Sequence, residues 1–366
     1  MLRYSNMKKI CLMFNHLRYQ DGVGRSAIAI ANQLTRLRLA EVTLIPLFIN
    51  DKSSHNLIDE GVKIKSGFGF YFRGMAQLVK YIPATWLHWW LIGNRYDIEV
   101  GFQFGLCTEC IAASKSRAVK YAWMHGYDNG LVLKDAYERI GTVCCVSRSN
   151  AERLHRELPS ITVDYNYNPI DDVQICQLGQ DSIEIERPAG LLFITAGRLS
   201  PEKGFLRLLD VMKRLKEDAF AFHLWIMGDG PDESELKKKY KELGLEEEVL
   251  FLGRQSNPYR FTTRADVFVC SSYSEGYSTV CTEAIMLGVP VVTTNVSGAH
   301  EIIDDAECGI LTGTDDESLY QGLRRVCEHP SLIEDWKERL VETKVRFSAE
   351  KRIQRLVDLF QLNRDE

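Results

Sequence analysis

Residues 266–294, DVFVCSSYSEGYSTVCTEAIMLGVPVVTT, carry the clearest structural signal in this chain. Their first apolar run, 267–270, predicts a buried parallel strand, and the polar SEGYS segment after it predicts a turn. Apolar residues at helical spacing then predict a helix from Thr279 to Leu287, which Gly288 ends before a second strand. The turn therefore joins the carboxyl end of a strand to a helix N-terminus, where open α/β sheets hold ligands and where backbone N–H groups favour an anion.

Two carboxylates flank this turn, Glu275 before the helix and Glu283 within its first turns. In one interpretation they are a helix-dipole glutamate and a solvated loop glutamate, and the sequence shows no obvious Lys or Arg partner near either. In the other, each accepts hydroxyl hydrogen bonds from a polyhydroxy ligand whose phosphates lie on the N–H groups of residues 277–280. The spacing alone favours neither interpretation.

Strands and helices alternate along both halves of the chain, which predicts two doubly wound parallel α/β sheets. The turn NYNPID (166–171) and the polar run that follows it to Pro188 predict a linker between two domains. The expected strands cover residues 8–15, 41–50, 95–103, 118–125 and 142–147 in the first half, and 191–197, 220–228, 249–253 and 265–272 in the second.

Length and composition agree with two globular domains, because the chain has 366 residues, 45% of them hydrophobic and 26% charged. No apolar run reaches the ~20 residues of a membrane-spanning helix, and the start, MLRYSNMKK, is too short and polar for a secretion signal, with Met7 a candidate first residue. Residues 1–168 carry a net charge of +7 and the remainder −12, which indicates different partners for the two halves.

The ten cysteines indicate reduced thiols in a cytoplasmic protein, because several lie inside apolar strands. Cys107 and Cys110 form the one CxxC pattern. No second pair or histidine cluster accompanies it, which argues against a zinc or redox role.

Two glycine patterns and two cations lie in segments after expected strands and are candidates for binding phosphate. Gly22, Val23 and Gly24 begin a GxGxxA pattern that does not directly follow its strand, as a dinucleotide turn requires. The alternative is that these residues let the backbone approach a diphosphate, and Gly228 in GDG likewise allows close approach to a ligand. Arg198 and Lys203 lie close enough in sequence to bind a diphosphate from two sides. Two surface cations without a ligand are the less favoured interpretation, because cations are unfavourable near a helix N-terminus unless an anion is present.

Residues 61–96 contain five Lys or Arg, no acid and nine aromatic residues. Packing against the sheet could absorb about half of these aromatics. Because three tryptophans within five residues cannot all face one core, we favour contact with an anionic membrane surface. The residues expected to make it are Lys80, Trp86, Trp89 and Trp90.

Glu275 and Glu283 form a Glu-x7-Glu pair that resembles the signature of the retaining glycosyltransferases of family four, which have the GT-B fold. GRLSPEKG (197–204) is similar to the family's phosphate clamp, with Arg198 and Lys203 in the matching places. Further segments resemble the family's glycine loop, histidine, strand–helix turn, hinge and later motifs: DGVGRSA (21–27), WMHGYDN (123–129), VSRSNAERL (146–154), NYNPID (166–171), IMGDGP (226–231), VLFLGR (249–254) and SGAHEIIDDAECGILT (297–312).

The resemblance implies two Rossmann-like domains that face a cleft. Residues 1–168 would bind the acceptor and residues 169–347 the nucleotide-sugar donor. The last helix, about 348–366, would cross back onto the first domain.

The resemblance also implies the chemistry: transfer of a sugar from a UDP- or GDP-sugar with retention of configuration, by same-face attack without an enzyme nucleophile. Glu275 would then position donor-sugar hydroxyls, Glu283 would hold the ribose diol, and His125 would contact far hydroxyls of the sugar. Arg254 lies where the family holds the base, and Arg148 is a candidate acceptor contact. The leaving diphosphate would be stabilised by Arg198, Lys203, Gly22, Val23, Gly24, Gly228 and the turn residues Gly276, Tyr277, Ser278, Thr279 and Val280.

No metal or other cofactor is expected. Asp304–Asp305 and Asp315–Asp316 are adjacent pairs that we assign to turns. Neither pair has the Asp-x-Asp spacing that chelates a divalent cation in the other major glycosyltransferase fold.

For the acceptor, a basic and aromatic first half indicates a lipid-linked saccharide at the inner face of the cell membrane, in the assembly of a surface polysaccharide or related glycan. Two alternatives remain: a nucleotide-sugar 2-epimerase of GT-B fold, and a non-catalytic protein that binds a nucleotide sugar or lipid headgroup. A nicotinamide oxidoreductase is disfavoured by the glycine spacing. Nucleic-acid binding is disfavoured because the cations lie among tryptophans and apolar runs.

Overall fold

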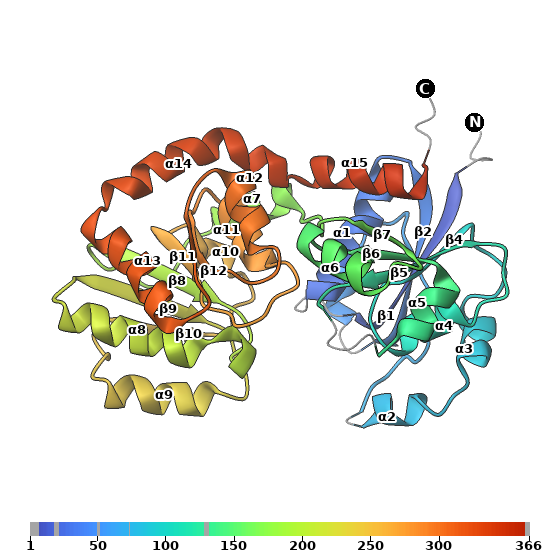
Figure 1. Ribbon diagram of the computed structural model, residues 1–366, viewed down its shortest axis with the longest axis horizontal. Helices are drawn as coiled ribbons and strands as arrows, with labels where there is room; N and C mark the ends of the chain where they lie inside the picture. Colours follow the sequence, from blue (N-terminus) through green and yellow to red (C-terminus); the bar gives the residue numbers. More distant parts are fainter. Residues whose placement is uncertain (1–6, 18–21, 50–51, 73, 128–131, 363–366) are drawn as a thin grey trace. The chain divides into compact units, whose positions relative to one another are not determined.

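The computed structural model describes residues 7–17, 22–49, 52–72, 74–127 and 132–362. Asp21, Arg73 and the Asp128–Asn129 part of the histidine segment lie outside the described residues. The chain divides into two compact units (Figure 1), which are Met1–Ile170 with Ala349–Glu366, and Asp171–Ser348. The assignment of acceptor and donor binding to these units stays a prediction.

The first unit contains a seven-stranded parallel sheet of order β3-β2-β1-β4-β5-β6-β7. Its order changes direction between β1 and β4, so the carboxyl ends of these two strands flank a topological switch point. The strands are β1 Lys8–Leu17, β2 Ala40–Ile49, β3 Lys63–Ile64, β4 Ile98–Gly101, β5 Val119–Met124, β6 Thr142–Cys145 and β7 Thr162–Tyr165.

Helices from both ends of the chain cover this sheet. The last helix packs on it, since Tyr121 Oη donates to the Leu359 carbonyl at 2.9 Å and the Tyr121 ring meets Phe360. The helices are α1 Gly22–Arg36, α2 Met75–Val79, α3 Ala84–Leu91, α4 Leu106–Ala112, α5 Lys134–Ile140, α6 Arg148–Glu157 and α15 Ala349–Phe360, with a 3-10 helix at Lys52–Leu57.

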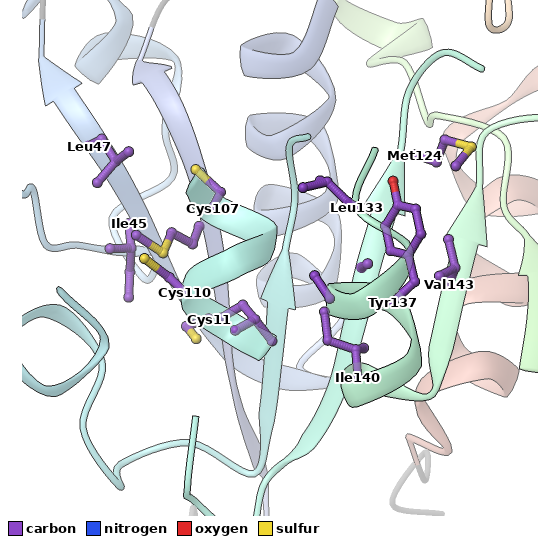
Figure 2. Packing of buried hydrophobic residues seen from close by; sticks show 14 of the residues in the cluster. Cys11, Ile45, Leu47, Cys107, Cys110, Met124, Leu133, Tyr137, Ile140 and Val143 are labelled. Atoms are coloured by element: carbon purple, nitrogen blue, oxygen red, sulfur yellow. The ribbon is translucent and has the colours of Figure 1, made fainter. Parts of the chain in front are cut away.

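The core of the first unit forms where α4 and α5 press apolar side chains onto the sheet, as Figure 2 shows. Cys107 and Cys110 project from α4 toward Ile45 and Leu47, and Tyr137 of α5 lies among the same cluster. All ten cysteines are free and eight are buried. The CxxC pattern therefore places two small apolar side chains on the buried face of one helix.

The second unit contains a six-stranded parallel sheet of order β10-β9-β8-β11-β12-β13, with its switch point between β8 and β11. The strands are β8 Leu191–Ala196, β9 Phe222–Met227, β10 Val249–Gly253, β11 Val267–Cys270, β12 Val291–Thr294 and β13 Ile310–Thr312. The helices are α7 Asp172–Gly179, α8 Phe205–Glu217, α9 Glu233–Glu242, α10 Tyr259–Thr262, α11 Thr279–Met286, α12 Ala299–Ala306, α13 Asp316–Glu328 and α14 Ser331–Thr343, with 3-10 helices at Pro201–Lys203 and Lys344–Phe347.

The predicted parallel α/β sheets and the strand–turn–helix–strand unit around β11 and α11 are confirmed. The chain divides between Ile170 and Asp171, within the NYNPID turn at which the linker is predicted. The polar run after this turn contains α7, which Asp171 caps by accepting the Gln174 N–H at 3.0 Å. Gly22 to Gly24 form the first turn of α1.

One local prediction is wrong: Asp304 and Asp305 are expected in a turn but lie inside α12. Asp315 instead caps α13 and accepts the Ser318 N–H at 2.8 Å. Among the described helices, none combines the length and apolar character that a bilayer crossing needs.

Candidate active site

The candidate site in the second unit lies at the switch point between β8 and β11. The 3-10 helix after β8 ends at Lys203, and the loop after β11 carries Glu275. Lys203 Nζ lies 2.6 Å from Glu275 Oε1, and Ser272 Oγ donates to the same oxygen at 2.7 Å. The expectation that Glu275 lacks a basic partner is therefore wrong, because the fold pairs it with a lysine from the neighbouring strand's loop.

This ion pair shapes the charge of the site. Burial alone would lower the pKa of Lys203, but the Glu275 carboxylate outweighs it and raises that pKa above its usual value. Lys203, Glu275 and Val280 together line a small cavity over the ends of β8 and β11. A fixed ammonium group thus faces the cavity beside the first turn of α11.

The loop after β11 is held by contacts with the loop after β8. Ser271 Oγ donates to the Lys203 carbonyl at 3.0 Å, and the Tyr273 N–H donates to the Glu202 carbonyl at 2.8 Å. Thr294 Oγ1 donates to the Ser272 carbonyl at 2.6 Å from β12. These bonds fix the position of Glu275 relative to Lys203.

Arg207 of α8 is a site-building residue that the sequence analysis missed. Its guanidinium is buried and donates to the carbonyls of Ser271, Ser272 and Thr314, with Nε to Ser271 at 2.7 Å and Nη1 to Thr314 at 2.7 Å. The Tyr273 ring covers it at 3.7 Å. In the sequence Arg207 has the place of an ordinary helix arginine, so only its three-dimensional neighbours show that it ties down this loop.

Position 228 must be glycine because the neighbouring backbone leaves no room for a side chain. It adopts φ +139°, and a side chain there would collide with the carbonyl of Gly197. Gly230 likewise lies directly against Leu199. Close approach is confirmed, but the partner that demands it is another segment of the same unit, so it is not evidence for a ligand.

The N-terminus of α11 follows directly after the Glu275 loop. Ser278 stands at the N-cap position without a side-chain hydrogen bond to the first turn. The first-turn N–H groups at Thr279 and Val280 therefore lack the side-chain cap that many helices have, and α11 is oriented from the Glu275 loop into the unit.

Glu283 lies one turn further along α11 and is buried. Tyr259 Oη of α10 is 3.5 Å from its Oε1, so a hydroxyl donor already stands beside this carboxylate. Arg254 is exposed and lies 3.6 Å from Asp229, while Arg198 is exposed at the start of the clamp segment. The structure thus brings Lys203, Glu275 and Val280 together and leaves both arginines on the surface of the same unit.

In the first unit His125 directly follows β5 and contacts the end of the adjacent β4. Its Nε2 lies 2.9 Å from the Phe102 carbonyl, which can only accept, so Nε2 carries the proton and Nδ1 is free to accept. Burial lowers the pKa of His125 to about 4, against the opposing effect of the Phe102 hydrogen bond. The ring is therefore neutral at pH 7 and presents a hydrogen-bond acceptor.

The remaining first-unit residues occupy two places. Arg148 is the first residue of α6, which Ser147 caps by accepting the Asn150 N–H. The Arg148 guanidinium donates to Tyr165 Oη at 3.3 Å. Near α3, Lys80, Trp86 and Trp89 are exposed, whereas Trp90 packs against the core.

Within the described part of the chain, no three His, Cys, Asp or Glu side chains gather in a way that could hold a metal ion. The expectation that transfer needs no metal stays a prediction.

Part of the second unit matches a known protein family. Residues 182–343 match the family model described as glycosyl transferases group 1. An N-acetylgalactosamine-N,N'-diacetylbacillosaminyl-diphospho-undecaprenol 4-alpha-N-acetylgalactosaminyltransferase of Campylobacter jejuni is 35% identical over 175 residues, which are 47% of this chain and 46% of that protein. The chain spans about half the length of the curated relatives it matches.

Solved structures extend the likeness to the whole chain. A glycosyltransferase from Rickettsia africae has a TM-score of 0.75 at 16% identity and covers 97% of this chain and 98% of its own. Anabaena HepE in complex with UDP has a TM-score of 0.71 at 18% identity, covering 97% and 100%. These likenesses show the GT-B fold. The match of residues 182–343 to this family model agrees with the resemblance of the motifs, and the expected fold is confirmed.

The protonation of His125 can be tested by NMR. Its ring should titrate near pH 4 instead of the ordinary 6.5, and near neutral pH it should be the tautomer with the proton on Nε2. Because the unfolded histidine binds a proton below 6.5 and the folded one does not until about 4, the first unit should lose stability as the pH falls through this window. A His125→Asn variant should lose less over the same range. A ring that titrates near 6.5 would contradict the assignment.

Proposed function

We propose that this chain is a retaining glycosyltransferase that moves a sugar from a nucleotide-diphosphate sugar to a saccharide acceptor. The observation that carries the proposal is the Lys203–Glu275 pair at the switch point of the second sheet, next to the N-terminus of α11. A leaving diphosphate gains charge as the glycosidic bond breaks. A preorganised cation and helix N–H groups are the groups that stabilise such charge.

Binding of the donor divides between charge and hydroxyl contacts. Lys203, with Arg198 and the N–H groups of residues 277–280, holds the diphosphate. Glu283 accepts the ribose diol beside Tyr259, and Arg254 marks the segment that holds the base. The donor class is a UDP- or GDP-sugar, and the UDP complex of the Anabaena neighbour supports the former.

Glu275 acts as a positioning group rather than a nucleophile. One of its oxygens already accepts from Lys203 and from Ser272, so its charge is partly neutralised and its orientation is fixed. It then holds hydroxyls of the donor sugar. The acceptor hydroxyl attacks from the face that the diphosphate leaves, which retains the configuration.

The acceptor is a lipid-linked saccharide in the assembly of a surface polysaccharide or related glycan. The Campylobacter relative is named for a diphospho-undecaprenol substrate, and a Rhizobium meliloti relative for lipopolysaccharide core biosynthesis. The exposed residues of α3 and Lys80 hold the protein at the cytoplasmic face of the membrane.

The donor site is tested by Lys203→Ala and Glu283→Ala. Lys203→Ala should lose about 100-fold or more in turnover, because removing one charge-stabilising contact typically costs that much. Glu283→Ala should lose about 10-fold or more in kcat/KM, because the ribose diol loses an acceptor and hydrogen bonds to charged groups contribute ~1.5–3 kcal/mol each. Cooperative unfolding should be retained. Lys213→Ala, which breaks an exposed pair with Glu217 on α8, serves as the control and should transfer sugar at the wild-type rate. Wild-type turnover in both site variants would refute the assignment.

Metal independence is tested by dialysis against EDTA followed by an assay of sugar transfer in metal-free buffer. Activity should stay within about twofold of the untreated enzyme, since Lys203 and helix N–H groups supply the positive charge that a metal ion supplies elsewhere. A large loss that added Mg²⁺ or Mn²⁺ restores would show that transfer needs a divalent cation.

Membrane contact is tested by sedimentation with phosphatidylglycerol vesicles. Combined Trp89→Ala and Lys80→Ala substitution should weaken binding about tenfold, because one lysine near an anionic surface contributes ~1 kcal/mol and an interfacial tryptophan adds a comparable amount. Val341→Ala, which alters an exposed apolar residue of the second unit, is the control. Unchanged sedimentation of the double variant would count against this surface.

A further inference from the structure

A pocket of about 390 Å³ lies between α3, α4 and α5 of the first unit, apart from the residues discussed so far. These helices lie together on one side of the sheet in Figure 1. The volume falls within the ~300–1,000 Å³ that is usual for small-ligand sites. Its lining consists of Ala84, Thr85, Glu109, Ala113, Val132, Leu133, Asp135, Ala136 and Arg139.

Three charged side chains face this pocket: Glu109 from α4, and Asp135 and Arg139 from α5. Asp135 and Arg139 are four residues apart, a spacing at which opposite charges commonly pair. In the described part of the chain, no ion pair within 4 Å joins them, and no side-chain hydrogen bond holds any of the three. The neighbouring Glu138, by contrast, pairs with Lys134 and accepts from Ser160.

The lining has the chemistry of a saccharide site. Two carboxylates offer acceptors for hydroxyl pairs, and one guanidinium offers donors in a planar fork. Between them, buried Leu133 and Ala136 present an apolar floor to the C–H face of a sugar ring. Two carboxylates against one cation disfavour a phosphate, so the bound part is the hydroxyl-rich sugar itself.

The pocket adjoins the exposed aromatic surface. Ala84 and Thr85 line it, and the same helix continues into Trp86, 48% exposed, and Trp89, 70% exposed. Val132 on the pocket's lining is 72% exposed. A sugar that occupies the pocket therefore lies beside side chains suited to a lipid surface.

Helix α3 is held rigidly although much of its outer face is apolar. Buried His88 pairs with buried Glu99 of β4 at 3.0 Å, and Ser116 Oγ donates to the second Glu99 oxygen at 2.7 Å. Lys65 Nζ donates to the Trp90 and Leu91 carbonyls at the end of the helix. Burial alone would raise the pKa of Glu99, but the hydrogen bonds with His88 and Ser116 hold that pKa below its usual value. These contacts of His88 and Lys65 fix the position of α3, and therefore the position of Trp86 and Trp89 relative to the pocket.

From this juxtaposition we propose that the α3–α4–α5 pocket is a subsite for the saccharide of a lipid-linked acceptor, whose lipid stays in the membrane that Trp86 and Trp89 contact. The inference rests on the proposed function, because it names where that acceptor's sugars bind. Glu109 and Asp135 accept their hydroxyls, and Arg139 donates to them.

The test uses the full chain with phosphatidylglycerol vesicles that carry a diazirine-labelled N-acetylhexosamine disaccharide on undecaprenyl diphosphate, without donor. Irradiation and peptide mass spectrometry should place the label on α4 or α5. The double variant Glu109→Gln with Asp135→Asn should reduce labelling about tenfold, since the amides still accept hydrogen bonds and only the additional strength of two charged acceptors is lost, roughly 0.5–1 kcal/mol each. Vesicle sedimentation should be unchanged. Glu138→Gln, on the same helix but outside the pocket, is the matched control.

A free disaccharide without lipid should label the pocket at least tenfold less, because the membrane no longer concentrates it. Equal labelling of the double variant and wild type, or label confined to other elements, would overturn the proposal. Pocket labelling in a protein that transfers no sugar would support the subsite while refuting the proposed function, so the two failures are distinguishable.

Discussion

The second unit depends on one partly buried ion pair between Lys203 and Glu275. Their loops leave adjacent strands, and the pair holds those loops at a fixed separation with both charges largely withdrawn from water. Removing charges from water is unfavourable unless each charge retains close partners. Here Ser272 Oγ donates a hydrogen bond to the same Glu275 oxygen that accepts from Lys203. The ammonium group is thus oriented before any ligand arrives, so a bound anion needs little further ordering of this side chain.

A second cation, Arg207, holds the loop that contains Glu275 in place. Buried Arg207 donates to three backbone carbonyls, and its nearest carboxylate oxygen, on Asp316, is 3.9 Å away. A guanidinium satisfied by carbonyl dipoles keeps much of its positive field, so it fixes the Glu275 loop and adds positive potential below the site. Gly204 and Gly228 let these segments approach without a side chain between them.

The first unit combines rigidity with an unusual surface. The His88–Glu99 pair and Lys65 hold α3 against β4 and leave Trp86 and Trp89 outside the core. Exposed tryptophans form an apolar patch beside a pocket lined by exposed charged side chains, and this arrangement fits a surface that meets lipid and sugar together. Neutral His125, whose donor is committed to Phe102, gives the same unit an acceptor at the end of β5.

Local sequence alone determined the parallel sheets, the helix that became Thr279–Met286 and the family resemblance, because hydrophobic periodicity and short motifs are properties of adjacent residues. It missed α7 and the cap at Ser147, where short polar segments gave little periodicity. Only the tertiary structure decided that Glu275 pairs with Lys203, that Arg207 lies under the same loop, and that Gly228 contacts Gly197. These partners are distant in sequence and meet because parallel strand order brings their loops to one sheet edge.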